Sequence, residues 1–171
     1  MPRAALLLAA LLLLGGCGFR PLYGEQATGG STAGALQTVQ VAPIADRPGQ
    51  QLHNALRNEL NPLGQPLDPL YSLAVSLTLR EQELGVRKDD TATRANLRVT
   101  GDYSLIRIAD DVVMTRGRAQ SVVAYNIVGS EFGTYHAEED ARQRGIEQLA
   151  QQIRLRLAAY LERLSSGVAS P

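Results

Sequence analysis

The sequence is poor in the side chains that most often carry catalysis or bind metals. It contains no tryptophan, one cysteine and two histidines in 171 residues. With a single thiol no internal disulfide can form, so packing alone must hold the fold together. His53 and His136 show no metal-ligand spacing with each other or with the cysteine. We therefore expect no metal site and no cofactor.

The sequence has no excess of charge of either sign, because it contains 17 basic and 17 acidic residues. A basic balance is typical of proteins that bind nucleic acid, so we expect no nucleic acid as a partner. Glycine-rich phosphate loops and a nucleophile elbow are also missing. The adjacent pairs Asp89-Asp90 and Asp110-Asp111 favour turns over an acid/base dyad, because neighbouring side chains of an extended chain point apart. The sequence predicts a protein that is not an enzyme, although a small periplasmic enzyme using His53 and His136 remains open as an alternative.

Long apolar runs are scarce, and the main one lies near the N-terminus. Ala4–Leu14 would span about 16 Å as a helix, roughly half of a bilayer core, which is too short for a membrane anchor. A basic start and small residues at the end are typical of a signal peptide. Leu14-Gly15-Gly16-Cys17 resembles the lipobox of bacterial lipoproteins, which implies that residues 1–16 are removed and Cys17 is lipidated. An ordinary signal peptide with a free thiol nearby is the alternative.

The remaining chain divides into one domain and two loose ends. Residues 17–35 contain the lipidated cysteine and a tether rich in Gly, Ser, Thr and Ala, for which we expect a flexible chain. Residues 36–164 form a single domain, and about 130 residues are enough to bury a stable core. Residues 165–171 are expected to be a disordered tail.

The spacing of apolar residues predicts an α+β fold. Period-two alternation predicts strands over 36–44, 71–86, 94–105 and 113–125, and helical spacing predicts helices over 50–60 and 137–164. Asp46 or Gly49 is expected to begin the first helix, and Ser130 or Thr134 to cap the second. We therefore expect a two-layer sandwich in the order β-α-β-β-β-α, with two helices on one face of a four-stranded, mostly antiparallel sheet.

Two details of this sandwich follow from residue pairing. A hairpin folded about Asp110 places residues whose numbers sum to about 220 opposite each other, so that Leu97 faces Val123 and Asp102 faces Arg118. The wrong parity of Ile106 predicts a bulge near the turn. Gly145, inside the apolar stripe of the last helix, predicts a close approach of that helix to the sheet.

Four arginines share the polar face of the predicted hairpin: Arg94, Arg98, Arg116 and Arg118. If the helices cover the Leu/Val face, these side chains project from the open side of the sheet. Guanidinium groups pair with phosphate or carboxylate, so the four arginines are candidate binding residues for an anionic glycolipid or for a protein partner. A solvated face balanced by Asp102, Asp89 and Asp90 is the alternative.

Three strings carry a family resemblance through their order and spacing: CGFRPLYG (17–24), VAPIADRPGQQLHNALRNEL (41–60) and HAEEDARQRGIEQLAQQIRLRLAAYL (136–161). Together they resemble the lipopolysaccharide-assembly lipoprotein family LptE, in its alphaproteobacterial form. The resemblance implies two helices packed on a four-stranded sheet. It also implies a complex with the outer-membrane β-barrel LptD, in which the lipoprotein acts as plug and assembly aid, binds lipopolysaccharide and helps insert it into the outer leaflet. Only Cys17 is carried over as a motif match.

The resemblance also implies a location, namely the periplasmic face of the outer membrane of a Gram-negative bacterium, with a lipid anchor. Gly18 after the cysteine, where Asp would resemble an inner-membrane retention signal, favours the same membrane. The competing hypothesis is a lipid-anchored periplasmic accessory subunit of an ABC-type transporter. Such subunits also combine a lipobox with a small α+β domain, and cell fractionation separates the two hypotheses.

Overall fold

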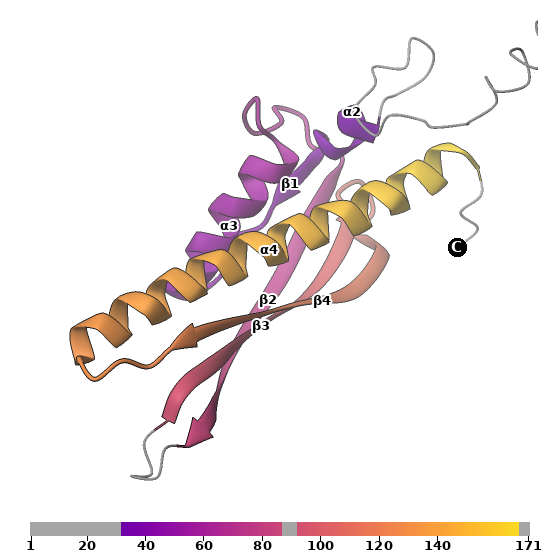
Figure 1. The fold of residues 1–171 in the computed structure, drawn as a ribbon. Coiled ribbons are helices and arrows are strands. Elements are labelled where there is room, and N and C mark those ends of the chain that lie inside the picture. Colours follow the sequence, from indigo (N-terminus) through magenta and orange to yellow (C-terminus); the bar gives the residue numbers. More distant parts are fainter. Residues whose placement is uncertain (1–31, 87–91, 168–171) are drawn as a thin grey trace, which may run out of the picture.

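The computed structural model describes residues 32–86 and 92–167, so the predicted signal peptide, Cys17 and the Asp89-Asp90 pair lie outside the described residues. Its elements are α2 (Thr32–Leu36), β1 (Val39–Val41), α3 (Asp46–Leu60), β2 (Tyr71–Val86), β3 (Ala92–Arg107), β4 (Val112–Asn126) and α4 (Glu131–Ser165). The strands form one sheet in the order β1-β2-β3-β4. The helices α3 and α4 lie side by side on one face of this sheet (Figure 1). The predicted two-layer α+β fold is confirmed.

The N-terminal part of the domain differs from the prediction. The expected strand over 36–44 is reduced to Val39–Val41, and residues 32–36, expected to end the tether and start the strand, form the short helix α2. Leu36 is buried at the end of this helix. β1 pairs with β2 in parallel, with Val39 opposite Tyr71, and α3 provides the crossover that a parallel pair requires. The sheet is therefore mixed, with two antiparallel pairs and one short parallel pair.

The long antiparallel strands have the predicted register. Leu97 pairs with Val123, Val99 with Ser121 and Asp102 with Arg118. The register shifts between Leu105 and Ile106, which confirms the expected bulge near the turn. The positive φ of Asp111, 55°, closes this turn in the left-handed region that Asp tolerates better than most residues.

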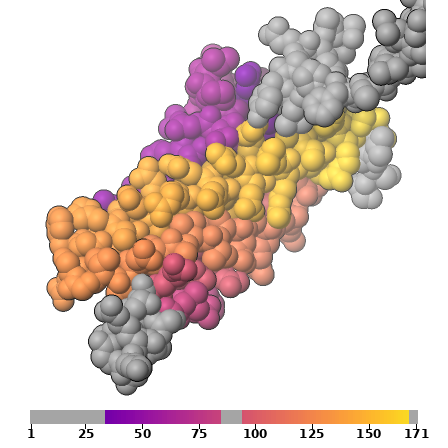
Figure 2. Space-filling model, in the orientation of Figure 1, coloured from indigo at the N-terminus to yellow at the C-terminus, as the bar shows by residue number. Residues whose placement is uncertain are grey.

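α4 is the longest element, and at 35 residues it extends about 52 Å. It begins at Glu131, six residues before the predicted start, and the side chain of Ser130 accepts a hydrogen bond from the backbone N–H of Gly133. Figure 2 shows the helix running along the length of the molecule beside α3. Among the described residues, no helix combines the length and apolarity needed to cross a membrane.

The core lies between the sheet and the helices α3 and α4, and α4 comes close to the sheet at Gly145. A Cβ atom at this position would lie 2.8 Å from Cγ2 of Val99. The hydroxyl of Ser121 donates a hydrogen bond of 2.6 Å to the Gly145 carbonyl. This contact confirms the predicted close approach and fixes which face of β3 and β4 is covered.

Candidate anion-binding face of the sheet

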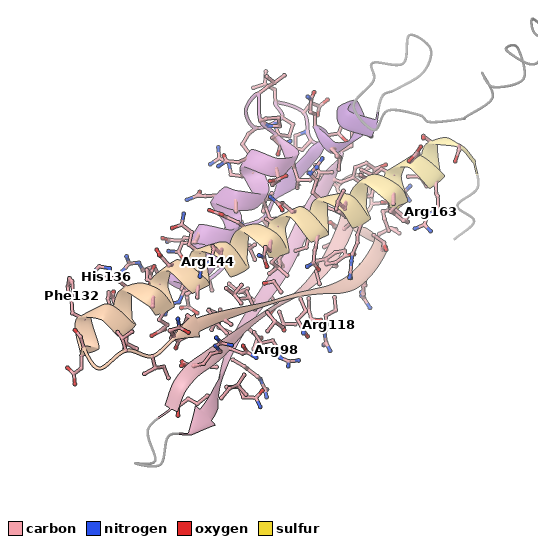
Figure 3. The ribbon with its side chains drawn as sticks, in the orientation of Figure 1. Arg98, Arg118, Phe132, His136, Arg144 and Arg163 are labelled. Carbon is pink, nitrogen blue, oxygen red and sulfur yellow. The ribbon has the colours of Figure 1, made fainter. Side chains whose placement is uncertain are left out.

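The face of the sheet opposite the helices is polar, because apolar and polar side chains alternate along the strands. Odd-numbered residues of β3 from Ala95 to Leu105 are buried against the helices, so even-numbered residues project from the other side. Figure 3 shows Arg98 and Arg118 on the side of the sheet away from α4. The structure thus places all four predicted arginines, Arg94, Arg98, Arg116 and Arg118, exposed on this open face.

Two of the predicted arginines, Arg94 and Arg98, lie toward the same end of the open face. Arg98 pairs directly with Arg80 of β2, and Arg94 lies four residues further along β3, about 14 Å away. There Arg94 lines a second pocket with Asp140 and Arg144 of α4. We call Arg80, Arg94 and Arg98 the arginine cluster. Side chains directly opposite on antiparallel strands have Cβ atoms about 4.5–5.5 Å apart. In the described part of the chain, no acidic side chain forms an ion pair with these three guanidinium groups.

A shallow pocket of about 430 Å³ lies in the arginine cluster. Five residues line it, namely Arg80, Arg98, Glu81, Gln82 and Asn96, and Arg94 is not among them. Gln82 and Asn96 pair with each other in the adjacent row of the sheet. Guanidinium and amide N–H groups are all hydrogen-bond donors. The pocket therefore offers a positive, donor-rich surface to an anion with several oxygens.

The other two predicted arginines lie toward the opposite end of the open face. Arg116 and Arg118 face Ser104 and Asp102, which lie six and four residues along β3 from Arg98, or about 20 and 14 Å. Arg118 donates two hydrogen bonds to the Asp102 carboxylate, at 2.6 and 3.3 Å. These bonds, together with the carboxylate charge, raise the pKa of the Arg118 guanidinium. Arg118 thus has an acidic partner within the protein, whereas no acidic side chain in residues 32–86 and 92–167 pairs with the arginine cluster.

Arg80 is the site residue that the sequence analysis did not select. Its parity places it opposite the leucine face of β2, and that signal was readable in the sequence. Its significance depends on strand order, because only the neighbouring position of β2 and β3 brings Arg80 opposite Arg98.

Each histidine contacts a neighbouring group of the fold. His53, on α3, is half-buried, and its Nδ1 lies 3.1 Å from the Ala42 carbonyl oxygen. His136 lies near the start of α4, where its ring contacts Phe132 edge-on with centroids 4.3 Å apart (Figure 3). Across residues 32–86 and 92–167, no group of three His, Cys, Asp or Glu side chains could hold a metal ion.

Comparison with known proteins agrees with this geometry. A family model described as LptE, lipopolysaccharide-assembly, matches residues 36–157, which is well over half of the chain. No curated protein sequence matches. Among solved structures, a lipoprotein from Caulobacter crescentus CB15 is similar, with a TM-score of 0.63 and 26% identity, covering 77% of this chain and 96% of that one.

Two solved structures of lower identity share the fold. A minor lipoprotein from Acinetobacter baumannii has a TM-score of 0.59 at 19% identity, covering 72% of this chain and 92% of that chain. Rare lipoprotein B from Shewanella oneidensis has a TM-score of 0.58 at 10% identity, covering 74% and 97% respectively. The family match over residues 36–157, on a domain with this fold, shows that the chain belongs to the LptE family of lipopolysaccharide-assembly lipoproteins.

Proposed function

We propose that the chain is an outer-membrane lipoprotein of the alphaproteobacterial form of its family, anchored by lipid at Cys17 on the periplasmic face. In this role it forms a complex with the LptD β-barrel as plug and assembly aid, binds lipopolysaccharide and aids its insertion into the outer leaflet. The LptE family is non-catalytic, which agrees with a role in binding and not in chemistry.

The arginine cluster is the observation that supports lipopolysaccharide binding. Like charges directly opposite on neighbouring strands destabilise a sheet, and Arg80 opposite Arg98 is such a pair. An anion that accepts hydrogen bonds from both guanidinium groups would offset this repulsion. Phosphate and carboxylate suit this role, because their oxygens match the guanidinium fork. Lipopolysaccharide carries phosphate and carboxylate groups in its inner part. Of the predicted residues, Arg94 and Arg98 belong to this cluster, and Arg116 and Arg118 extend the basic face.

The exterior of the domain supports the plug role. The lumen of a large barrel is polar and wet, so its occupant needs a polar surface of mixed charge. Besides the open face of the sheet, a groove of about 460 Å³ between α3 and α4 is lined mostly by amide and carboxylate side chains, among them Gln51, Asn54, Asn58, Gln143 and Gln151. These groups can form hydrogen bonds with polar side chains of a lumen wall.

Charge reversal in the arginine cluster tests the binding role. We expect Arg94→Glu combined with Arg98→Glu to weaken binding of purified lipopolysaccharide about tenfold or more at low salt, without loss of folding, because both residues are exposed. The matched control is Arg47→Glu with Arg57→Glu, which changes the net charge equally on α3. Equal weakening by both pairs would show that net charge, and not this face, governs binding.

Affinity capture tests the complex. Protein extracted from native outer membranes in mild detergent is expected to bring down a large β-barrel, identified by mass spectrometry. Recovery from inner-membrane vesicles together with a transporter ATPase would instead support the accessory-subunit hypothesis.

A further inference from the structure

One end of the domain carries exposed aliphatic side chains that the proposed function does not use. In the connection between α3 and β2, Leu63 is 89% exposed, Leu67 is fully exposed and Leu70 is 53% exposed. Ile108 and Val112, at the turn between β3 and β4, are also exposed. We call these five residues the leucine end. Large apolar side chains gathered in one exposed region usually mark a contact with another molecule or with a membrane.

Hydrogen bonds place the leucine end beside α2. The backbone N–H of Leu70 donates to the carbonyl of Thr38 at 2.9 Å, and the N–H of Ile108 donates to the carbonyl of Leu70 at 3.0 Å. Thr38 follows α2 by two residues. Figure 1 shows the connection between α3 and β2 next to α2, at the end of the molecule where the chain from Cys17 enters the domain. The N-terminus of α4 lies at the opposite end.

The loop holds its leucines in an ordered conformation. Each leucine directly follows a proline, in the sequence Pro62-Leu63, Pro66-Leu67 and Pro69-Leu70, and the ring of proline fixes φ. Gly64, with φ of 115°, donates its N–H to the carbonyl of Asn61 and closes a turn. A loop restricted in this way loses little conformational entropy when its side chains enter an apolar environment.

The length of chain between Cys17 and α2 indicates which surface lies near the leucine end. Fifteen residue steps separate Cys17 from Thr32, which reach about 50 Å at most and about 20 Å for a relaxed chain. A lipid anchor at Cys17 therefore keeps the end that carries α2 close to the bilayer, while α4 carries the other end about 50 Å further away. We propose that the leucine end inserts shallowly into the phospholipid surface beside the anchor. This inference rests on the proposed lipidation of Cys17.

The charged residues of the loop and turn limit the depth. Asp68 lies exposed between Leu67 and Pro69, so it must stay at the level of the headgroups. In the neighbouring turn Asp110 is paired with Arg107 at 2.8 Å, and the adjacent Asp111 is exposed and must also stay at the level of the headgroups. Insertion at the boundary between headgroups and acyl chains satisfies both the leucines and these carboxylates.

A fluorescent probe at position 67 tests the inference on the lipidated full-length mature chain. Because the chain has a single cysteine and lipidation blocks it, Leu67→Cys supplies one free thiol for an environment-sensitive dye. The protein is reconstituted into vesicles of phosphatidylethanolamine and phosphatidylglycerol that contain brominated lipid. We expect a blue-shifted emission and quenching by brominated lipid that is several-fold stronger than for the control Phe132→Cys, an exposed residue in the first turn of α4 at the opposite end of the molecule.

The outcomes separate this inference from the proposed function. Mass spectrometry of the same sample reports lipidation of Cys17 independently, so failure of the anchor is recognised directly. With Cys17 lipidated, a water-exposed dye at position 67 overturns the inference. It is equally overturned if the dye leaves water only after the co-purified barrel is added, because the leucine end would then bind a protein.

Discussion

At the scale of single residues, the packing of α4 on the sheet requires a residue without a Cβ atom at position 145. Alanine normally stabilises a helix by about 1 kcal/mol over glycine. At Gly145 we expect the opposite, because the added Cβ would lie 2.8 Å from a methyl of Val99, which is fully buried and cannot move aside. Gly145→Ala should lower the free energy of unfolding by about 1–3 kcal/mol in chemical denaturation. Gln148→Ala, on the exposed side of α4, should stay within about 0.5 kcal/mol.

Asp102 offers a second test at this scale, in the direction of a gain. Its carboxylate accepts two hydrogen bonds from the guanidinium of Arg118. Asp102→Asn frees that guanidinium and makes the open face more positive, so lipopolysaccharide binding should tighten about two- to fivefold at low salt. The gain should fade at high salt, as titration calorimetry can show. The double variant Asp102→Asn, Arg118→Gln should bind like the parent, and a persistent gain there would place the effect elsewhere.

The residues of this face illustrate what single positions reveal in the sequence. Strand alternation alone placed Arg94, Arg98, Arg116 and Arg118 on one face, and the structure confirms that placement. Their binding role stays a prediction. The direct opposition of Arg80 and Arg98 was not predicted, because it depends on which strands are neighbours and on the register between them. The ion pair of Arg118 with Asp102 was predictable, since the hairpin register follows from the turn.

At the scale of elements, the long strands and most ends of the two long helices were predictable. Asp46 begins α3 and Ser130 caps α4, each as one of two expected residues, whereas α2 was not predicted. Matching apolar residues across the hairpin determine its register, because a shift by one residue would expose the core face. Residues 32–36 contain too few apolar side chains for a helical stripe, so α2 could not be distinguished from a tether. The first turns of α4 include the exposed residues Phe132 and Tyr135, and a helix segment that buries little shows no periodicity.

The turn between β3 and β4 gives a pH-dependent prediction. Hydrogen bonds from Arg107 hold the pKa of Asp110 below its usual value. A carboxyl group whose pKa is lower in the folded state stabilises that state above its unfolded-state pKa, and the contribution is lost as pH falls through the folded-state pKa. We expect Asp110→Asn to lower the melting temperature slightly at pH 7, and the difference to disappear in strong acid.

A double-mutant cycle provides the control for this turn. Arg107→Gln, Asp110→Asn and the double variant should show coupling in thermal unfolding at neutral pH and none in strong acid. Coupling of equal size at both pH values would mean that the two side chains interact by packing and not as an ion pair.

At the scale of the whole molecule, the proposed lipid anchor at Cys17 predicts where the domain acts. Cys17→Ser removes the sulfur that the lipobox requires, so the variant should lose its acyl chains and leave the outer-membrane fraction. One acyl chain holds a protein only marginally and two or more hold it stably, so the shift between fractions should be large. Fractionation followed by immunoblotting measures it. Wild-type protein with an unmodified sulfur in the soluble periplasm would contradict the anchor.

The shortness of β1 has a consequence for how copies of the protein behave toward each other. Because β1 pairs only with Tyr71–Leu73, the outer side of β2 from Ala74 onward has no neighbouring strand among the described residues. An unpaired strand edge of this kind can form backbone hydrogen bonds with a strand of another molecule. Arg80, Glu81 and Glu83 lie along it, exposed, and stacking these charges in register would be unfavourable. The charges along this edge therefore oppose in-register pairing of β2 in one copy with β2 in another.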